Sequence, residues 1–349
     1  MMKPPITTEE LRQAAEPLPR VQLAHLPTPL EELPRFAAVL GGPRVFIKRD
    51  DCTGLAFGGN KSRHNEFVLG EVVRQGADML VWGAGVQSNN CRQTAASCAK
   101  LGIDCHLVLS NTHHAEDVQG NLLLDHILGA TYEIADVPIG PQLDALIQER
   151  VEEFRALGRK VFDFDREVIK VRAATSYALC YAELMDQVSA LGIEPDAVYS
   201  CAGGATGAGL ALGRAALGKS APVHAILPIR WPWDEAEDIA KYATKTAECL
   251  GIDVQIEPSE IDISDEYVGE DYGVPTAAGM EAIALLARNE GILVDVSYSG
   301  KALGALVDQV RKGRYTSDQA IVFVHTGGTP ALFAARDQIV EMIPPKKRS

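Results

Sequence analysis

The stretch Gly58-Gly59-Asn60-Lys61-Ser62-Arg63 sets one lysine in a paired-glycine turn between two structured segments. On its amino-terminal side, residues 45–49 (VFIKR) have the alternating, β-branched character of a short strand. On its carboxyl-terminal side, residues 63–75 carry apolar side chains at helical spacing. We therefore expect Lys61 at a loop-to-helix junction, where glycines let a ligand approach the backbone and helix amides favour an anion.

Three interpretations of Lys61 compete. A nucleotide-binding P-loop needs Gly-Lys-Ser/Thr at a fixed spacing after a first glycine, but counted from Gly54 the extra Asn60 separates Gly59 from Lys61. A lysine in a pocket can instead form a Schiff base with an aldehyde cofactor. The plain alternative is a solvated lysine on a loop, the usual position of this residue. The mismatch weighs against the P-loop, and the rest of the chain must separate the other two.

The composition indicates a globular protein. With 349 residues, 46% of them hydrophobic and 23% charged, the chain is long enough for two lobes. A formal net charge of -14 argues against nucleic acid or an anionic membrane surface as the main partner. Seven cysteines without repeated CxxC spacing favour a reduced, cytoplasmic setting. No apolar run is long enough for a signal peptide or a membrane span, so we expect neither export nor anchoring.

From Gly76 onward, short apolar segments alternate with amphipathic ones. The expected buried strands are 79–82, 106–109, 132–134, 198–200, 223–227, 292–296 and 321–324. This alternation predicts an α/β fold with mainly parallel sheets, whose ligands gather at the carboxyl ends of the strands. The pairs Cys105-His106 and His113-His114 lack the helical spacing of metal ligands, so we expect no metal.

Four loops that follow expected strands carry glycine or polar side chains. Residues 83–90 (GAGVQSNN) place serine and amide groups at a helix start, where they hold a carboxylate or a ring hydroxyl, or simply cap the helix. Residues 201–209 (CAGGATGAG) expose successive amides, which suit a phosphate group or close helix packing. Residues 297–300 (SYSG) follow the expected strand 292–296. Residues 325–330 (HTGGTP) follow the expected strand 321–324, and there we expect Thr329 as the N-cap and Pro330 as the first residue of a helix. Together with Lys61, these loops indicate a cofactor pocket.

The chain resembles the D-cysteine desulfhydrase and 1-aminocyclopropane-1-carboxylate deaminase family in motifs that occur in the family's order. They are GGNKSR (58–63), GVQSNNCRQTAA (85–96), CAGGATGAGL (201–210), EDYGVP (270–275), SYSGKA (297–302) and HTGGTPALF (325–333). The resemblance begins at LPTPLEELPRF (26–36) and covers nearly the whole chain. It implies a pyridoxal 5'-phosphate enzyme of the tryptophan-synthase β-type fold (fold type II), with two open, mainly parallel sheets and helices on both faces. It also implies a homodimer, with a small domain at 64–172 and a large domain formed by 1–63 and 173–349.

The same resemblance assigns the site residues. It implies Lys61 as the Schiff-base lysine and Asn60 and Asn89 near the cofactor's ring oxygen. It implies that the cofactor phosphate is bound by Ala202, Gly203, Gly204, Ala205 and Thr206, and that Ser299 and Thr326 are further cofactor contacts. Ser88 matches the residue at the substrate carboxylate, with Gln87, Asn89 and Asn90 beside it, and Tyr272 and Tyr298 match two pocket tyrosines. Lys61, Ser88, Tyr272 and Tyr298 are the expected catalytic residues.

The implied reaction is elimination from a β-substituted, D-cysteine-like amino acid, in which the freed Lys61 amine removes the α-proton and pyruvate and ammonia are released. The alternative is the deaminase reaction, which gives 2-oxobutyrate and ammonia, and a more distant one is a non-catalytic protein that binds nucleotide or phosphate. Ser299 stands where the deaminase branch has glutamate; a neutral hydroxyl there favours elimination. His64-Asn65 and Asn90-Cys91 depart from the family pattern beside the pocket and leave the substrate open.

Overall fold

Two β-sheets organise the protein in the computed structural model, which describes residues 4–111 and 118–345. The larger sheet has the order β1 (Leu30–Glu32), β2 (Arg44–Lys48), β9 (Ala320–Val324), β6 (Ala197–Cys201), β7 (Val223–Ile226), β8 (Ile263–Ser264). In this sheet β1 is antiparallel to β2, and the other neighbours are parallel. The smaller sheet consists of β3 (Met79–Gly85), β4 (Asp104–Ser110) and β5 (Thr131–Ala135), all parallel. The predicted α/β fold with mainly parallel sheets is confirmed.

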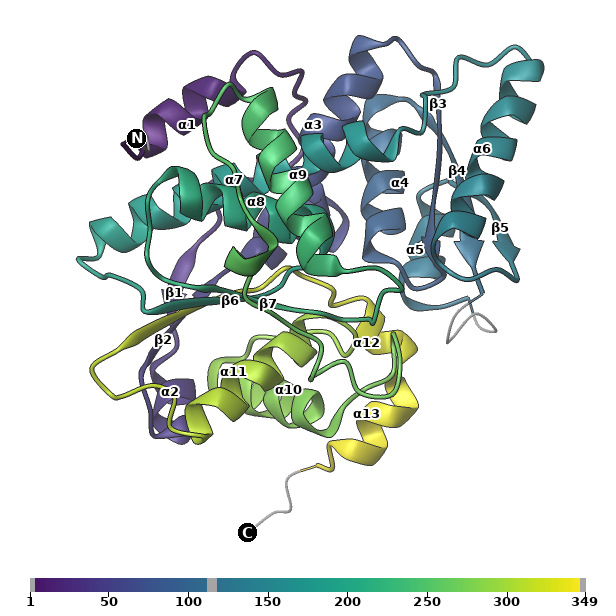
Figure 1. The fold of residues 1–349 in the computed structure, drawn as a ribbon. Helices are drawn as coiled ribbons and strands as arrows, with labels where there is room; N and C mark the ends of the chain where they lie inside the picture. The colour runs from purple at the N-terminus through teal and green to yellow at the C-terminus, as the bar shows by residue number, and fades with distance from the viewer. Residues whose placement is uncertain (1–3, 112–117, 346–349) are drawn as a thin grey trace.

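Helices cover both faces of the larger sheet (Figure 1). On one face lie α7 (Arg166–Ala190), α8 (Gly204–Ala216) and α9 (Glu235–Cys249), and on the other α10 (Ala277–Glu290) and α11 (Ser299–Arg311). The alternation of side chains along β9 explains the two layers. Val322 and Val324 pack with α7 and α8, whereas Ile321 and Phe323 pack with α10 and α11. The sheet is therefore buried on both faces, as its apolar strands predict.

The smaller sheet is sandwiched in the same way. Leu80 and Leu107 pack with α3 (Asn60–Arg74), α4 (Asn89–Leu101) and α5 (Gly120–Ile127), while Val81 and Val108 pack against α6 (Pro141–Ala156). The remaining helices are α1 (Thr8–Ala15), α2 (Pro34–Leu40), α12 (Ala331–Ala334) and α13 (Arg336–Met342). The strands β3 to β5 fall within residues 64–172 and the other strands outside that range. The domain limits themselves stay a prediction.

One predicted strand is wrong. Residues 292–296 belong to no strand of the described chain. The prediction recognised burial, because Val294 and Val296 are buried in the core below the larger sheet. It misjudged pairing, because the segment leads directly into α11 and Asp295 bonds to the start of that helix. A short apolar run does not by itself separate a ladder strand from another buried segment.

Two features of the described chain bear on membrane anchoring and metal binding. No helix within 4–111 and 118–345 combines the length and apolar character needed to cross a bilayer. In the same ranges, no three or more His, Cys, Asp or Glu side chains are grouped so that they hold a metal ion. His113 and His114 lie outside the described residues, as do the basic residues 346–348.

Candidate active site

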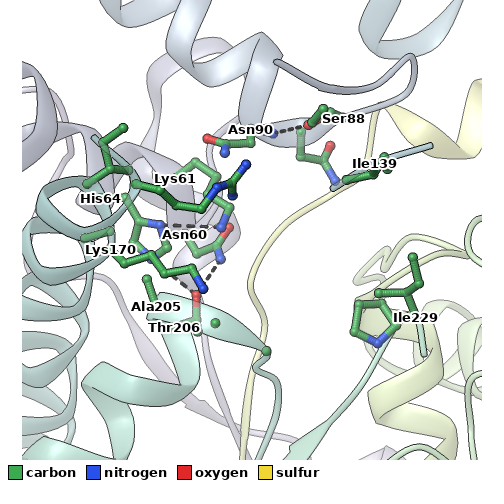
Figure 2. A pocket seen from close by; sticks show the side chains of 18 of the residues that line it. Asn60, Lys61, His64, Ser88, Asn90, Ile139, Lys170, Ala205, Thr206 and Ile229 are labelled. Carbon is green, nitrogen blue, oxygen red and sulfur yellow. Dashed lines mark hydrogen bonds between the residues drawn. The ribbon is translucent and has the colours of Figure 1, made fainter. Parts of the chain in front are cut away.

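A cavity of about 480 Å³ brings together segments from both sheets. It is lined by the predicted residues Asn60, Lys61, Ser88, Asn89, Asn90, Gly203, Gly204, Ala205, Thr206, Tyr272, Tyr298 and Thr326. Figure 2 shows Lys61, Asn60 and Thr206 close together, with Ser88 and Asn90 above them in the view. The loops that follow β3, β6 and β9 therefore meet at one place, as the carboxyl ends of parallel strands in such sheets do.

The glycine turn before Lys61 is required by its backbone. Gly58 and Gly59 have φ angles of 65° and 121°, in the left-handed region that other residues avoid. A Cβ on Gly58 would lie 2.0 Å from the carbonyl oxygen of Asp51. The turn is held by Gly59 N, which donates to Thr53 Oγ1 at 2.8 Å, and by Asn60 N, which donates to the carbonyl of Thr326 at 3.0 Å. Lys61 follows immediately, in the first turn of α3.

Lys61 is held as a partly neutral amine. Burial lowers the pKa of Lys61 to about 8, an effect that the nearby Cys201 thiol opposes. Its Nζ lies 3.4 Å from Nδ1 of His64. Because only the neutral amine is a nucleophile or a base, this shift makes a useful fraction of Lys61 reactive near neutral pH. Lys61 is only partly exposed and lines the cavity, so it is not a fully solvated loop lysine.

The glycine-rich loop at the start of α8 both leaves room for an anion and allows close helix packing, the two alternatives that the sequence left open. Gly204 has a φ of 56°, and a Cβ there would meet no described heavy atom within 4 Å, so this backbone faces open space. Further along, a Cβ on Gly207 would lie 2.2 Å from the carbonyl of Ala202, and one on Gly209 would lie 2.3 Å from that of Ala174. The first glycines therefore open an anion cradle, and the later ones allow α8 to pack closely.

Glu235 sits at this cradle and was missed by the sequence analysis. Its Oε1 accepts a 2.6 Å hydrogen bond from Gly204 N, and its Oε2 accepts a 2.8 Å bond from Trp233 Nε1. Burial raises the pKa of Glu235, although these two donors oppose the effect. Asp234, just before it, caps α9 by accepting from Ala236 N and Glu237 N. No sequence signal separates Glu235 from the other acids of this helix start.

Ser88 both caps a helix and lines the cavity. Its Oγ accepts from the amides of Asn90 and Cys91 at 3.1 and 3.2 Å. Asn89 is oriented by Asn121, whose Nδ2 donates to Asn89 Oδ1 at 3.0 Å. Gln87 turns away from the site, since its amide donates to the carbonyl of Gln119 and accepts from Asn121 N. Gln87 is therefore placed to fix the neighbouring loop rather than to face a ligand.

Tyr272 and Tyr298 reach the cavity from different loops. Their hydroxyl groups are hydrogen-bonded to each other, and their rings meet edge to face with centroids 5.7 Å apart. Burial raises the pKa of Tyr272 to about 12 and raises that of Tyr298 well above its ordinary value. Both hydroxyls therefore keep their protons at neutral pH and can donate them.

Besides Gln87, two predicted residues do not line the cavity. Ala202 and Ser299 are buried and are not among the described lining residues. Ser299 bonds to Asp295, a residue that the sequence analysis placed in a strand and therefore overlooked. Thr326 lines the cavity, and its carbonyl holds Asn60. The expected cap at Thr329 is wrong, because α12 begins at Ala331, Pro330 occupies the N-cap, and no described side chain caps it.

The donors of the cavity fit a phosphorylated aldehyde. The first amides of α8 have no partner within the helix, which suits an anion, although Gly204 N donates to Glu235; the Thr206 hydroxyl lines the same cavity. The Lys61 amine stands at the same cavity to attach an aldehyde carbon. Asn60 and Asn89 place side-chain amide groups at the same cavity. A nucleotide P-loop would need the lysine in another register.

A family model described as pyridoxal-phosphate dependent enzyme matches residues 21–327. The chain belongs to this family of pyridoxal-phosphate-dependent enzymes. The match confirms the predicted cofactor and the prediction of an enzyme. This pyridoxal-phosphate-dependent enzyme is 36% identical over 334 residues to D-cysteine desulfhydrase of Serratia proteamaculans (strain 568). The alignment covers 94% of this chain and 99% of the relative.

Solved structures agree with the family. The enzyme matches an ACC deaminase homologue with a TM-score of 0.86 at 31% identity, over 98% of this chain and 100% of the other. It also matches holo diaminopropionate ammonia lyase from Escherichia coli with a TM-score of 0.66 at 15% identity, over 97% and 91% of the two chains. At that identity the second likeness concerns the fold alone. The predicted family and fold type are thereby confirmed.

Proposed function

We propose that this enzyme is a lyase that eliminates the β-substituent of a D-cysteine-like amino acid, releasing pyruvate, ammonia and the leaving group. The observation that carries the proposal is the 36% identity to a D-cysteine desulfhydrase along 99% of that relative. The cavity supports it, because a partly neutral lysine and two protonated tyrosines line the same space. A base and an acid are the two groups that such an elimination needs.

Each residue has a proposed task. The first amides of α8 and the Thr206 hydroxyl hold the phosphate, and Lys61 binds the aldehyde carbon. When bound, pyridoxal phosphate supplies an electron sink that stabilises negative charge at the substrate's α-carbon. Ser88, Asn89 and Asn90, which line the cavity at the start of α4, hold the substrate carboxylate, because a helix start favours an anion.

The proton transfers are proposed for three side chains. Lys61 takes the α-proton, since its lowered pKa leaves part of the amine neutral. The Tyr272 and Tyr298 pair donates a proton to the departing group, because burial keeps both hydroxyls protonated. The cavity walls around these groups limit access of water to the reacting atoms.

A second candidate is ring-opening deamination of 1-aminocyclopropane-1-carboxylate to 2-oxobutyrate and ammonia. It is favoured by the TM-score of 0.86 to an ACC deaminase homologue. The preference for elimination that Ser299 suggests stays a prediction, and one contact of Ser299 weighs against it. The Ser299 hydroxyl is backed by the Asp295 carboxylate, so a negative charge stands directly behind the neutral group.

We also propose that the enzyme is a cytoplasmic homodimer. Ile127 on α5, Phe333 on α12 and Val340 on α13 are each 67% exposed, and α5 packs against α12. Apolar side chains gathered on one surface are typical of protein interfaces. All seven cysteines are free thiols, which suits a reducing compartment. Sedimentation of the wild type and of Phe333→Asp tests the dimer: the variant is expected to shift toward the monomer mass, and an unchanged monomer mass for both would contradict it.

The function is tested on the purified protein. We expect visible absorption from bound cofactor, and borohydride reduction is expected to fix the cofactor's mass on the Lys61 peptide. Incubation with D-cysteine or 3-chloro-D-alanine is expected to release pyruvate, with Lys61→Ala folded but inactive as the control. Release of 2-oxobutyrate from the cyclopropane substrate, with no pyruvate from either enantiomer of the β-substituted alanines, would establish the second candidate instead. A colourless protein that binds ATP would overturn both.

A further inference from the structure

His64 links the lysine of the site to its anion cradle. It lies three residues after Lys61 on the same face of α3, and its side chain is buried at 4% exposure. Its Nδ1 is 3.4 Å from Lys61 Nζ, and its Nε2 is 3.2 Å from Thr206 Oγ1. The ring is held edge to face against Tyr177, with centroids 5.3 Å apart. One side chain therefore contacts the two groups on which the proposed function depends.

The donor and acceptor capacities of the three side chains determine the direction of these two hydrogen bonds. Below its pKa of about 8, Lys61 is mostly an ammonium group, which only donates. In that state Nδ1 of His64 accepts from Lys61, and the ring proton resides on Nε2. Burial, together with the nearby Lys61, holds the pKa of His64 well below 6.5, so the ring stays neutral and keeps this acceptor. The Nε2 proton is then donated to Thr206 Oγ1.

Thr206 receives a second donor from the opposite side. Asn60 Nδ2 donates to the same oxygen at 3.0 Å. A hydroxyl oxygen accepts two hydrogen bonds, so both lone pairs of Thr206 are used and only its own hydrogen remains. Thr206 lines the cavity at the start of α8, and an ionised phosphate offers only acceptors.

We propose that His64 is a positioning residue with two separable tasks in this chain: it orients the Lys61 amine, and it turns the Thr206 hydroxyl toward the cofactor phosphate. The first task rests on the proposed function, in which Lys61 moves the α-proton. The second concerns binding alone. Because each task uses a different ring nitrogen, substitutions that imitate one nitrogen at a time separate them.

Two amide variants make this separation. In His64→Asn the side-chain oxygen can occupy the place of Nδ1, which preserves an acceptor for Lys61 and removes the donor to Thr206. In His64→Gln the terminal amide can occupy the place of Nε2, which preserves the donor to Thr206 and removes the acceptor for Lys61. His64→Leu removes both contacts. Thr206→Val removes the hydroxyl without touching His64, and serves as the matched control for the second task.

The phosphate task is read from binding to the cofactor-free protein. The measured quantity is the affinity for pyridoxal phosphate divided by that for pyridoxal, which lacks the phosphate. Loss of one hydrogen bond is expected to lower this ratio by about three- to tenfold in His64→Asn and Thr206→Val. The ratio is expected to stay within about twofold of wild type in His64→Gln.

The lysine task is read in two ways. The rate at which formaldehyde and a borohydride reagent methylate Lys61 in the cofactor-free protein is expected to change in His64→Gln and to stay near wild type in His64→Asn. The kcat for pyruvate release at saturating cofactor is expected to fall by about three- to tenfold in His64→Gln and to change least in His64→Asn.

The decisive result is that each amide variant changes one quantity and spares the other: His64→Asn the binding ratio, and His64→Gln the methylation rate. If both amide variants change both quantities equally, or change neither, His64 has no separable positioning tasks and the proposal is overturned. If the wild type eliminates none of the tested substrates, the proposed function fails, but the binding ratio and the methylation rate still decide this proposal. If His64→Leu does not fold, the two amide variants and Thr206→Val carry the test.

Discussion

The Ser299 hydroxyl donates a 2.5 Å hydrogen bond to Oδ1 of Asp295. The same oxygen accepts from Ser299 N at 2.8 Å, and Oδ2 accepts from the amides of Ser297 and Tyr298, both at 2.9 Å. Asp295 is fully buried, so these bonds compensate for the loss of its hydration. One carboxylate thus fixes the backbone from which Tyr298 reaches the cavity.

Removal of this carboxylate is expected to destabilise the protein. In Asp295→Ala the start of α11 keeps its buried amides but loses their acceptor, which is expected to lower the free energy of unfolding by about 2 to 4 kcal/mol. Ser299→Ala removes the hydroxyl that bonds to the Asp295 carboxylate, to Asp295 N and to the Gly327 carbonyl, but keeps the amide bonds to the carboxylate. It is therefore expected to cost less, about 1 to 2 kcal/mol. Urea unfolding of the two variants measures both values. Equal stabilities would show that Asp295 does not organise this segment.

The tyrosine pair is expected to act in turnover rather than in cofactor binding. Tyr272→Phe and Tyr298→Phe remove one hydroxyl each and are expected to lower kcat by about 10² to 10⁴ if that hydroxyl transfers the proton. Cofactor affinity is expected to change little. Because burial raises the pKa of Tyr272 to about 12, no loss of rate from its ionisation is expected between pH 7 and about 10. Steady-state kinetics of both variants, with either substrate class, is the measurement; full activity in both would remove the pair from the mechanism.

A buried ion network behind the site is expected to govern stability. Arg63 donates to Asp50 at 2.9 Å and to Glu183 at 2.8 Å, with both Arg63 and Asp50 shielded from solvent. Arg63→Met leaves Asp50 as a buried charge without its main partner and is expected to cost about 3 to 5 kcal/mol. Arg44→Met breaks an exposed pair with Glu32 and is the control, with an expected cost of about 0 to 1 kcal/mol. Similar losses in the two variants would contradict the role of burial.

The same network predicts a response to acid. Burial alone would raise the pKa of Asp50, but Arg63, Lys48 and the Tyr177 hydroxyl together hold it below 3.8. A carboxyl group whose pKa is lower in the folded state than in the unfolded state stabilises the fold at pH values above its unfolded-state pKa. This contribution is lost as the pH falls through the folded-state pKa. Wild-type stability is therefore expected to fall below about pH 4. Asp50→Asn is expected to show a smaller fall over the same range in urea titrations.

Glu235 is expected to compete with anions for the start of α8. Its carboxylate already accepts from Gly204 N, and its negative charge repels a bound anion. Glu235→Gln is expected to bind sulfate more tightly, by about three- to tenfold, in the cofactor-free protein. Because burial raises the pKa of Glu235, the wild type is expected to gain sulfate affinity as the pH falls and this carboxylate takes up a proton. Calorimetry at pH 5 and pH 8 measures both effects, and an equal gain in the variant would show that another group is responsible.

Local patterns determined much of the site. The turn before Lys61 has backbone angles that residues other than glycine avoid, so Gly58 and Gly59 alone were enough to predict it. Ser88 caps α4 through the amides of Asn90 and Cys91, a contact confined to neighbouring residues. The strands were found from apolar runs between helical segments, and the family motifs added the roles of residues within them. These features share one physical basis, because each depends on interactions within a few residues along the chain.

The tertiary structure alone decided which distant residues meet. His64 and Thr206 are 142 positions apart, and Tyr272 and Tyr298 are 26 apart, yet each pair forms a hydrogen bond. Gln87 turns toward the 119–121 loop, and Glu235 reaches the cradle from α9. Residues 292–296 are buried without joining a sheet. Periodicity records how strongly a segment prefers burial, but the partner that it finds depends on how helices and sheets pack in three dimensions.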